Sequence, residues 1–171
     1  MWRLSLMKKQ ILADTCNLYA VIGVWHREST TYYVKRSEKM ENYPGLWSLF
    51  SIQYQPEELP DPEDLTRIEP LMQKMSKERL CGQPVTVKSY LIAGDSDNNS
   101  IDKHVFLHLY EIEFGREPDL NPDYYEVGEW LSPEEYEHRS AGKKCGLCLR
   151  LWSDYAWLAG LTDRPFVTQE I

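Results

Sequence analysis

The segment that decides the fold runs from Tyr32 to Glu58, with the sequence YYVKRSEKMENYPGLWSLFSIQYQPEE. Its first residues alternate as in a β-strand, where every second side chain points to the same face of a sheet. A charged, turn-prone stretch follows, and the dipeptide Pro44-Gly45 then marks a turn. The mostly apolar residues directly after the turn, 46–50 (LWSLF), predict that the chain returns to a hydrophobic core.

The same segment resembles the entry to a Nudix domain, where a strand, a basic residue and a variable loop precede the sequence PGLWSLPGG. The first six residues of that sequence stand here at 44–49, whereas residues 50–52 (FSI) occupy the Pro-Gly-Gly positions. Residues 126–135 (EVGEWLSPEE) resemble a later part of the family, in which an acidic residue and a Trp lead into a helix. The resemblance covers most of residues 18–160. It implies an α/β (α+β) protein, a Nudix-like sandwich with a mixed β-sheet flanked by helices.

Length and composition predict a single domain over residues 1–171. Hydrophobic residues make up 42% of the chain and charged residues 27%, as in ordinary globular domains. The net charge of −8 argues against binding polymeric nucleic acid or an anionic membrane surface, because both need a cationic face. No apolar run approaches the about 18 residues of a membrane-spanning helix. The N-terminus also lacks the pattern of a secretory signal, so we expect a cytoplasmic protein, with its oligomeric state left open.

The remaining patterns predict the same architecture. Residues 18–25 (LYAVIGVW) are almost wholly apolar, as in a strand covered on both faces. In the helical pattern that ends near Gly82, Asp61 is the expected cap, and Pro70 predicts either a kink or a break into two pieces. The order of the elements favours a mixed sheet flanked by helices. Further strands are predicted at 84–94, 104–114 and 125–131, a loop at 95–102, and helices after Ser132 and at 147–158, the last one apolar at Leu147, Leu151, Tyr155, Leu158 and Ala159.

The chemistry of Nudix enzymes depends on a sequence box, G-x5-E-x7-R-E-U-x-E-E-x-G-U, in which U is a bulky aliphatic residue. The family hydrolyses a diphosphate linked to another moiety with Mg²⁺ or Mn²⁺. A hard cation that bridges phosphate oxygens must itself be held by carboxylates, and several acids on one helical face supply them. The number of acids that align with the box therefore decides how far the resemblance extends to catalysis.

The box aligns poorly in every register. Anchored at its start, it matches Glu58 to the first Glu and finds no later acid pair. Anchored at its end on Gly82, it places Arg79 and Leu80 at the Glu-Glu positions. A shift by one residue matches Glu78 to one Glu. We therefore expect a degenerate metal site, with Glu58 and Glu78 as residual catalytic candidates, unless these acids only form the solvated face of a helix and loop.

The candidate ligand-binding residues are Arg36, Trp47 and three residues of the long strand at 104–114. In that strand Val105, Leu107 and Leu109 form an apolar face, and the opposite side chains are aromatic or polar. We expect the opposite side chains to line a concavity together with groups near Trp47 or Arg36. The alternatives to ligand binding are that the strand histidines are simply half-buried, and that the Trp only anchors the turn. The three strand residues are Phe106, His108 and Tyr110.

Two weaker motifs point to ordinary structure. Cys145 and Cys148 form a CxxC pair, but no second pair stands at a spacing that suits zinc, which favours two reduced thiols. Residues 95–100 (DSDNNS) resemble a calcium loop but lack the required Gly and Glu, which favours a hairpin loop.

Three functional hypotheses remain open. The first is a Nudix-like domain with a degenerate metal site that binds a nucleotide-like small molecule, or a partner, without efficient hydrolysis. The second is an active nucleotide pyrophosphohydrolase that uses Mg or Mn and a rearranged set of acids. The third is a protein-interaction scaffold without a small-molecule ligand.

Overall fold

The structure, a computed structural model, describes residues 17–98, 102–140 and 146–167. These residues form strands and helical segments in the alternating order that the sequence predicts. The helical segments are η1 (Pro56–Glu58), α2 (Leu65–Arg79), α3 (Pro133–Arg139) and α4 (Leu147–Leu158). The strands are β1 (Asn17–Val24), β2 (His26–Arg27), β3 (Thr30–Arg36), β4 (Trp47–Ser48), β5 (Phe50–Gln53), β6 (Thr86–Asn98), β7 (Lys103–Glu113) and β8 (Tyr125–Leu131).

The larger sheet has the strand order β5-β1-β7-β6 and is mixed. β1 runs parallel to β7 over its whole length, whereas β5 and β6 pair antiparallel with their neighbours. The last five residues of β1, from Ala20 to Val24, are all buried. This is the burial expected of a strand that is covered on both faces. The predicted fold class, a mixed sheet flanked by helices, is confirmed.

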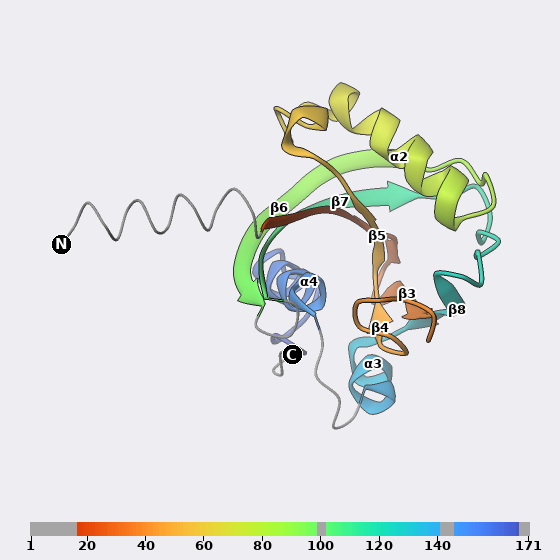
Figure 1. Ribbon diagram of the computed structural model, residues 1–171. Helices are drawn as coiled ribbons and strands as arrows, with labels where there is room; N and C mark the ends of the chain where they lie inside the picture. The colour runs from red at the N-terminus through yellow and green to blue at the C-terminus, as the bar shows by residue number, and fades with distance from the viewer. Residues whose placement is uncertain (1–16, 99–101, 141–145, 168–171) are drawn as a thin grey trace.

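Helices α2 and α4 cover opposite faces of this larger sheet (Figure 1). On the α2 face, Val21 and Tyr110 pack in one core with Met72 of the helix. On the α4 face, Ala20 and Leu107 belong to a second core. Because successive residues of a strand point to opposite faces, β1 and β7 contribute to both cores.

The smaller sheet is built around β3, which pairs antiparallel with β2, β4 and β8. Its Tyr33 stacks on Tyr136 of α3, with ring centroids 4.7 Å apart. Helix α3 begins at the predicted capping box. The Ser132 hydroxyl accepts a hydrogen bond from the Glu135 N–H, and the Glu135 carboxylate accepts one from the Ser132 N–H at 2.7 Å.

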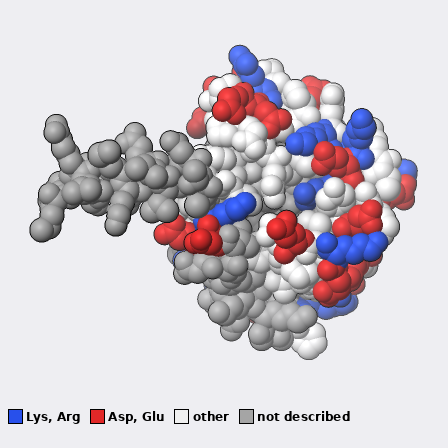
Figure 2. Space-filling model, in the orientation of Figure 1, with Lys and Arg blue, Asp and Glu red and all other residues white. Residues whose placement is uncertain are grey.

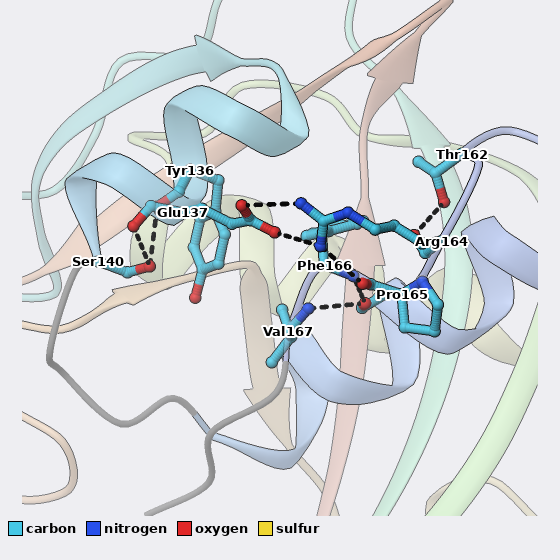
Figure 3. A network of polar contacts seen from close by, with 9 residues as sticks. Tyr136, Glu137, Ser140, Thr162, Arg164, Pro165, Phe166 and Val167 are labelled. Atoms are coloured by element: carbon cyan, nitrogen blue, oxygen red, sulfur yellow. Dashed lines mark hydrogen bonds and ion pairs between the residues drawn. The ribbon is translucent and has the colours of Figure 1, made fainter.

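The residues after α4 connect it to α3 (Figure 3). Arg164 forms an ion pair with Glu137 of α3, with 2.9 Å between Nη1 and Oε1. The Ser153 hydroxyl of α4 accepts hydrogen bonds from the N–H groups of Phe166 at 2.7 Å and Val167 at 3.0 Å. Ser153 is fully buried, so these bonds satisfy its oxygen where water cannot. The segment thereby holds the position of α4 relative to α3.

Helix α2 differs from its prediction at its start and in its middle. Its cap is Asp64 rather than Asp61, and the Asp64 carboxylate accepts a hydrogen bond from the Thr66 N–H at 3.0 Å. Pro70 lies inside the helix without dividing it. One backbone hydrogen bond is lost at Pro70, and the residues Ile68, Leu71 and Met72 on both sides of it are buried.

Two further elements differ from the sequence pattern. β6 extends to Asn98, so half of the predicted loop at 95–102 belongs to a strand that pairs with β7. Helix α4 has the predicted bounds, and Leu147, Leu151 and Tyr155 pack partly buried against the core, but its fully buried side chains include Leu149 and Trp152, and Leu158 is 72% exposed. The helix is apolar on more than one side, and only the position of the sheet decides which side is covered.

The surface shows mixed charge. On the face in Figure 2, Lys and Arg side chains are interspersed with Asp and Glu side chains rather than gathered into one cationic stripe. A stripe of this kind is what polymeric nucleic acid requires. Among the described residues, no helix has the length and hydropathy needed to cross a membrane.

Candidate functional site

A cavity of about 140 Å³ lies between the two sheets and the first turn of α4. Its wall combines side chains of β1, β3, β5 and β7 with the loop before β4, the last residue of α2 and the end of β6. Aliphatic and aromatic groups alternate there with a small set of polar groups. A concave wall of this mixed kind is typical of a small-molecule site.

Arg36, the last residue of β3, lines the cavity. The loop before β4 fixes its position through hydrogen bonds. Its Nε donates a hydrogen bond to the Asn42 carbonyl at 3.0 Å. The loop closes on the Arg36 backbone, which donates to the Leu46 carbonyl at 2.8 Å and accepts from the Gly45 N–H at 3.1 Å. Gly45 has a φ of +69°, and a Cβ there would collide with the Glu38 carboxylate. The Pro-Gly turn quoted from the sequence therefore shapes one wall of the cavity.

Arg79, the last residue of α2, enters the cavity from the other side. Its Nη1 donates a hydrogen bond to the Ser51 hydroxyl at 3.0 Å. Its guanidinium lies over the ring of Tyr124, 4.6 Å from the centroid. The helix ends directly after it, at positive φ angles of 51° for Cys81 and 81° for Gly82. The Gly82 N–H donates to the Ser76 carbonyl at 2.9 Å, which fixes the end of the helix and with it the direction of Arg79.

Arg36 and Arg79 are both largely buried as residues, and neither has a carboxylate partner among the described residues. Arg36 is 8% exposed and Arg79 is 7% exposed. Among the described residues, every ion pair involves other side chains, and the Arg79 Nε–H has no hydrogen-bond partner. Burial lowers the pKa of Arg36, and the nearby positive charge of Arg79 lowers it further. The described wall thus holds two positive charges that no described protein group neutralises.

The carboxylate of Asp97, at the end of β6, also lines the cavity but is paired with a histidine. His104 Nδ1 lies 2.5 Å from Asp97 Oδ1, and His104 Nε2 lies 2.7 Å from Asp95 Oδ2. The hydrogen bond to Asp97 raises the pKa of His104, and the bond to Asp95 adds to this effect. Because both imidazole nitrogens face a carboxylate, the protonated ring is the form that satisfies both.

Cys148, in the first turn of α4, is the thiol in the described wall. Its Sγ lies 3.7 Å from the Ser48 hydroxyl. Burial raises the pKa of Cys148, although this hydrogen bond opposes the rise. A buried thiol with a raised pKa stays protonated at neutral pH and is a poor nucleophile or metal ligand. The other cysteine of the predicted CxxC pair, Cys145, lies outside the described residues.

The structure brings two of the predicted ligand-binding residues together. Arg36 and Trp47 both line the cavity, and Trp47 is only partly buried. The expected grouping with the long strand is not found, because the face of β7 that lines the cavity is the apolar one, with Val105 and Leu107. The aromatic face of β7 points instead towards α2.

The three strand residues on that face make contacts within the protein. Phe106 stacks on Tyr19 with centroids 5.0 Å apart. His108 Nδ1 lies 3.2 Å from the Tyr90 hydroxyl, and burial lowers the pKa of His108. The fully buried Tyr110 donates its hydroxyl hydrogen to the Pro62 carbonyl. Tyr110 belongs to the core between the sheet and α2, whereas Phe106 and His108 are only partly buried and contact Tyr19 and Tyr90; none of the three lines the cavity.

The two acids proposed as residual catalytic candidates also lie apart from the cavity wall. Glu58 is exposed, and its carboxylate accepts a hydrogen bond from the Gln55 N–H at 2.6 Å in η1. Glu78 is partly buried near the end of α2, where its carbonyl accepts from Asn121 Nδ2 at 2.8 Å. In the described part of the chain, no three His, Cys, Asp or Glu side chains group as a metal site would require.

Arg79 is a residue of the cavity wall that was not predicted from the sequence as a site residue. The signal was available in the box register anchored on Gly82, which places Arg79 at the first Glu of the Glu-Glu pair. The structure ends α2 at Arg79 and turns the chain at Gly82, as that register requires. Ser51, which accepts the hydrogen bond of Arg79, occupies the second of the missing Pro-Gly-Gly positions and had no sequence signal of its own.

Comparison with known proteins finds similarity in structure. No family model and no curated protein matches the sequence significantly. A NUDIX hydrolase from Nitrosomonas europaea superposes with a TM-score of 0.61 at 14% identity, covering 87% of this chain and 93% of that one. A MutT NUDIX hydrolase from Burkholderia pseudomallei gives 0.52 at 18% identity, covering 70% and 85%. The ORF135 protein of E. coli gives 0.51 at 17% identity, covering 74% and 81%.

At sequence identities this low, the structural similarity shows the architecture alone. The chemistry must be argued from the residues of the site. The likeness agrees with the sequence segments at 44–49 and 126–135, which lie in the loop and β4 beside the cavity and in β8 with the start of α3. The described chain therefore has a Nudix-like fold.

Proposed function

We propose that this Nudix-like domain binds a nucleotide-like, phosphorylated ligand in the cavity and does not hydrolyse it efficiently with a divalent metal. The observation that supports the proposal is the pair of largely buried arginines, Arg36 and Arg79, in the cavity wall. Arginine suits phosphate because its planar group donates two parallel hydrogen bonds to two oxygens. Tyr43 and Trp47 lie in the same wall and offer aromatic surface to a base or sugar.

The residues of the cavity do not suit a catalytic Mg²⁺ or Mn²⁺ ion. An ion of this kind is held by oxygen ligands, with carboxylates foremost among them. Asp97 is the carboxylate among the described lining residues, and it is already paired with His104. Arg79 stands at the position of an acid in the box register anchored on Gly82, and its charge would repel a cation at short range. We therefore assign no catalytic step to a metal.

Turnover and binding should be measured on the same protein. With Mg²⁺ or Mn²⁺ present, we expect negligible hydrolysis of nucleoside triphosphates, ADP-ribose and dinucleoside polyphosphates. Titration calorimetry in EDTA should still detect binding of a nucleotide. Glu78→Gln should leave both this affinity and the melting temperature unchanged, because the Glu78 side chain does not line the cavity.

Two results would contradict the proposal. Robust metal-dependent turnover that Glu78→Gln abolishes would establish the hydrolase hypothesis with a rearranged set of acids. Failure of every nucleotide to bind would remove the small-molecule ligand and leave the interaction scaffold as the better hypothesis.

A further inference from the structure

We propose that Arg36 and Arg79 together form a subsite for a phosphate monoester, and that they bind it directly, without a bridging metal ion. The inference rests on the proposed nucleotide-like ligand and specifies its chemistry: a terminal phosphate rather than an internal diphosphate. Arg79, which stands at the first Glu of the Glu-Glu pair in the box register anchored on Gly82, would then contact the phosphate with a cation that belongs to the helix itself.

The two arginines are held by contacts that leave outer donors for a ligand. Arg36 uses its Nε to bind the Asn42 carbonyl, and Arg79 uses its Nη1 to bind the Ser51 hydroxyl. Within the described residues, the Nη groups of Arg36 and the Nη2 of Arg79 make no hydrogen bond. The Ser51 hydroxyl accepts from Arg79, so its own hydrogen can be donated to a ligand oxygen. The site therefore offers donors from three side chains.

Two arginines in one cavity wall, both largely buried as residues and without a carboxylate partner in the described part of the chain, are the strongest sign that an anion belongs between them. A buried charge is costly unless it is paired and hydrogen-bonded. As whole residues Arg36 is 8% exposed and Arg79 is 7% exposed, the Arg79 Nε–H is fully buried without a hydrogen-bond partner, and no ion pair among the described residues involves either arginine. An anion bound between them would supply the missing charge and relieve their mutual repulsion.

The charge of a phosphate monoester matches this pair. With a second pKa of about 6, a monoester carries a charge of about −1.5 to −2 at pH 7. An internal diphosphate carries the same total of about two negative charges but spreads them over two phosphate groups, whereas a monoester gathers them on the single group that would lie between the two guanidinium groups. Other titratable groups of the described wall do not change the net charge that the two arginines present to the ligand. Cys148 and Tyr43 stay neutral because burial raises the pKa of each, and Asp97 is paired with His104.

The size of the cavity also favours the end of a ligand over its middle. A dry cavity of about 150 Å³ accommodates a molecule of the size of benzene, and this one measures about 140 Å³. It has room for a terminal phosphate and part of the attached group, with the rest of the ligand outside. The partly buried Trp47 lies in the wall, where it can contact that remainder.

The test is titration calorimetry of the full chain in EDTA with AMP, adenosine and ADP-ribose. AMP carries a terminal monoester, adenosine carries no phosphate, and ADP-ribose carries only an internal diphosphate. We expect AMP to bind about tenfold more tightly than adenosine or ADP-ribose, because a hydrogen bond to a charged group contributes about the free energy that corresponds to a tenfold change in affinity. Arg79→Gln should remove that preference. Arg67→Gln, on the exposed side of the same helix, is the matched control and should keep it.

A second measurement does not depend on a variant that folds. Crystals of the unaltered protein soaked with tungstate, a tetrahedral oxyanion, should show its anomalous signal within hydrogen-bond distance of both guanidinium groups. A signal elsewhere, or none, would overturn the subsite.

The outcomes separate the subsite from the proposed function. If AMP binds the unaltered protein and Arg79→Gln equally, the subsite is wrong while nucleotide binding stands. If inorganic phosphate binds in an Arg79-dependent manner but no nucleotide does, the subsite stands and the nucleotide-like ligand is wrong. A requirement of AMP binding for Mg²⁺ would overturn direct binding by arginine.

Discussion

The two faces of the larger sheet share strands β1 and β7 but differ in how their space is filled. Under α2, Tyr110 and Phe50 are fully buried, and Phe50 contacts Phe114 and Tyr125 edge to face. On the other face, the shorter side chain of Ala20 borders a cavity of about 140 Å³. Aromatic residues on a strand therefore do not by themselves indicate a pocket. Here they fill the face under α2, and the cavity lies where small and aliphatic residues meet a second sheet.

The face of the larger sheet under α2, called the solid face here, should tolerate truncation of its buried side chains poorly. Phe50→Ala should lower the free energy of unfolding by about 3–5 kcal/mol, because it removes a fully buried ring and leaves a cavity. Urea unfolding followed by circular dichroism measures the loss. The control is Trp157→Ala, at a side chain that is 47% exposed, with an expected change within about 0.5 kcal/mol. Similar losses for the two variants would mean that the α2 face is not closely packed.

Enlarging two neighbouring residues of β1, one on each face, should change the stability of the protein by different amounts. Val21→Leu adds a methylene group to the solid face and should destabilise the protein by about 1–3 kcal/mol. Ala20→Leu projects into the cavity and should change stability by less than about 1 kcal/mol. It should also weaken AMP binding, because it occupies ligand space. Thermal unfolding and calorimetry test both effects, and equal destabilisation by the two substitutions would remove the distinction between the faces.

The rim of the cavity should show a smaller effect that depends on pH. The pKa of His104 is raised in the folded protein, mainly by its hydrogen bond to Asp97. Its contribution to stability is therefore fully present below the unfolded pKa of about 6.5 and is lost as the pH rises through the folded value. Because Asp97 is largely exposed, we expect less than about 1 kcal/mol.

His104→Gln measures this contribution. The stability difference between the unaltered protein and the variant should be larger at about pH 6 than at about pH 9. A difference that grows with rising pH would show that the histidine is not held in its charged form. Lys88→Gln, at an exposed ion pair on the same strand as Asp97, is a control with little dependence over this range.

Local signals in the sequence determined much of the fold. The capping box at Ser132, the bounds of β8 and the bounds of α4 were all predictable. Caps, turns and apolar periodicity act over a few residues, so they are readable without knowledge of the rest of the chain. The resemblance of residues 44–49 to the Nudix pattern predicted the Nudix-like fold, and Arg36 and Trp47, on either side of the Pro-Gly turn, both line the cavity.

Tertiary structure decided which surfaces face each other. The positions of α2 and the smaller sheet decide whether the aromatic or the apolar face of β7 lines the cavity. The alternation of side chains along the strand is the same in both cases, so the sequence does not distinguish them. Arg79 could be a solvated helix residue by sequence alone. It becomes a site residue because the end of α2 is fixed at Gly82 and Ser51 of a distant strand lies within hydrogen-bond distance. Contacts across such separations carry no local pattern, so only the folded chain brings the two arginines to one cavity.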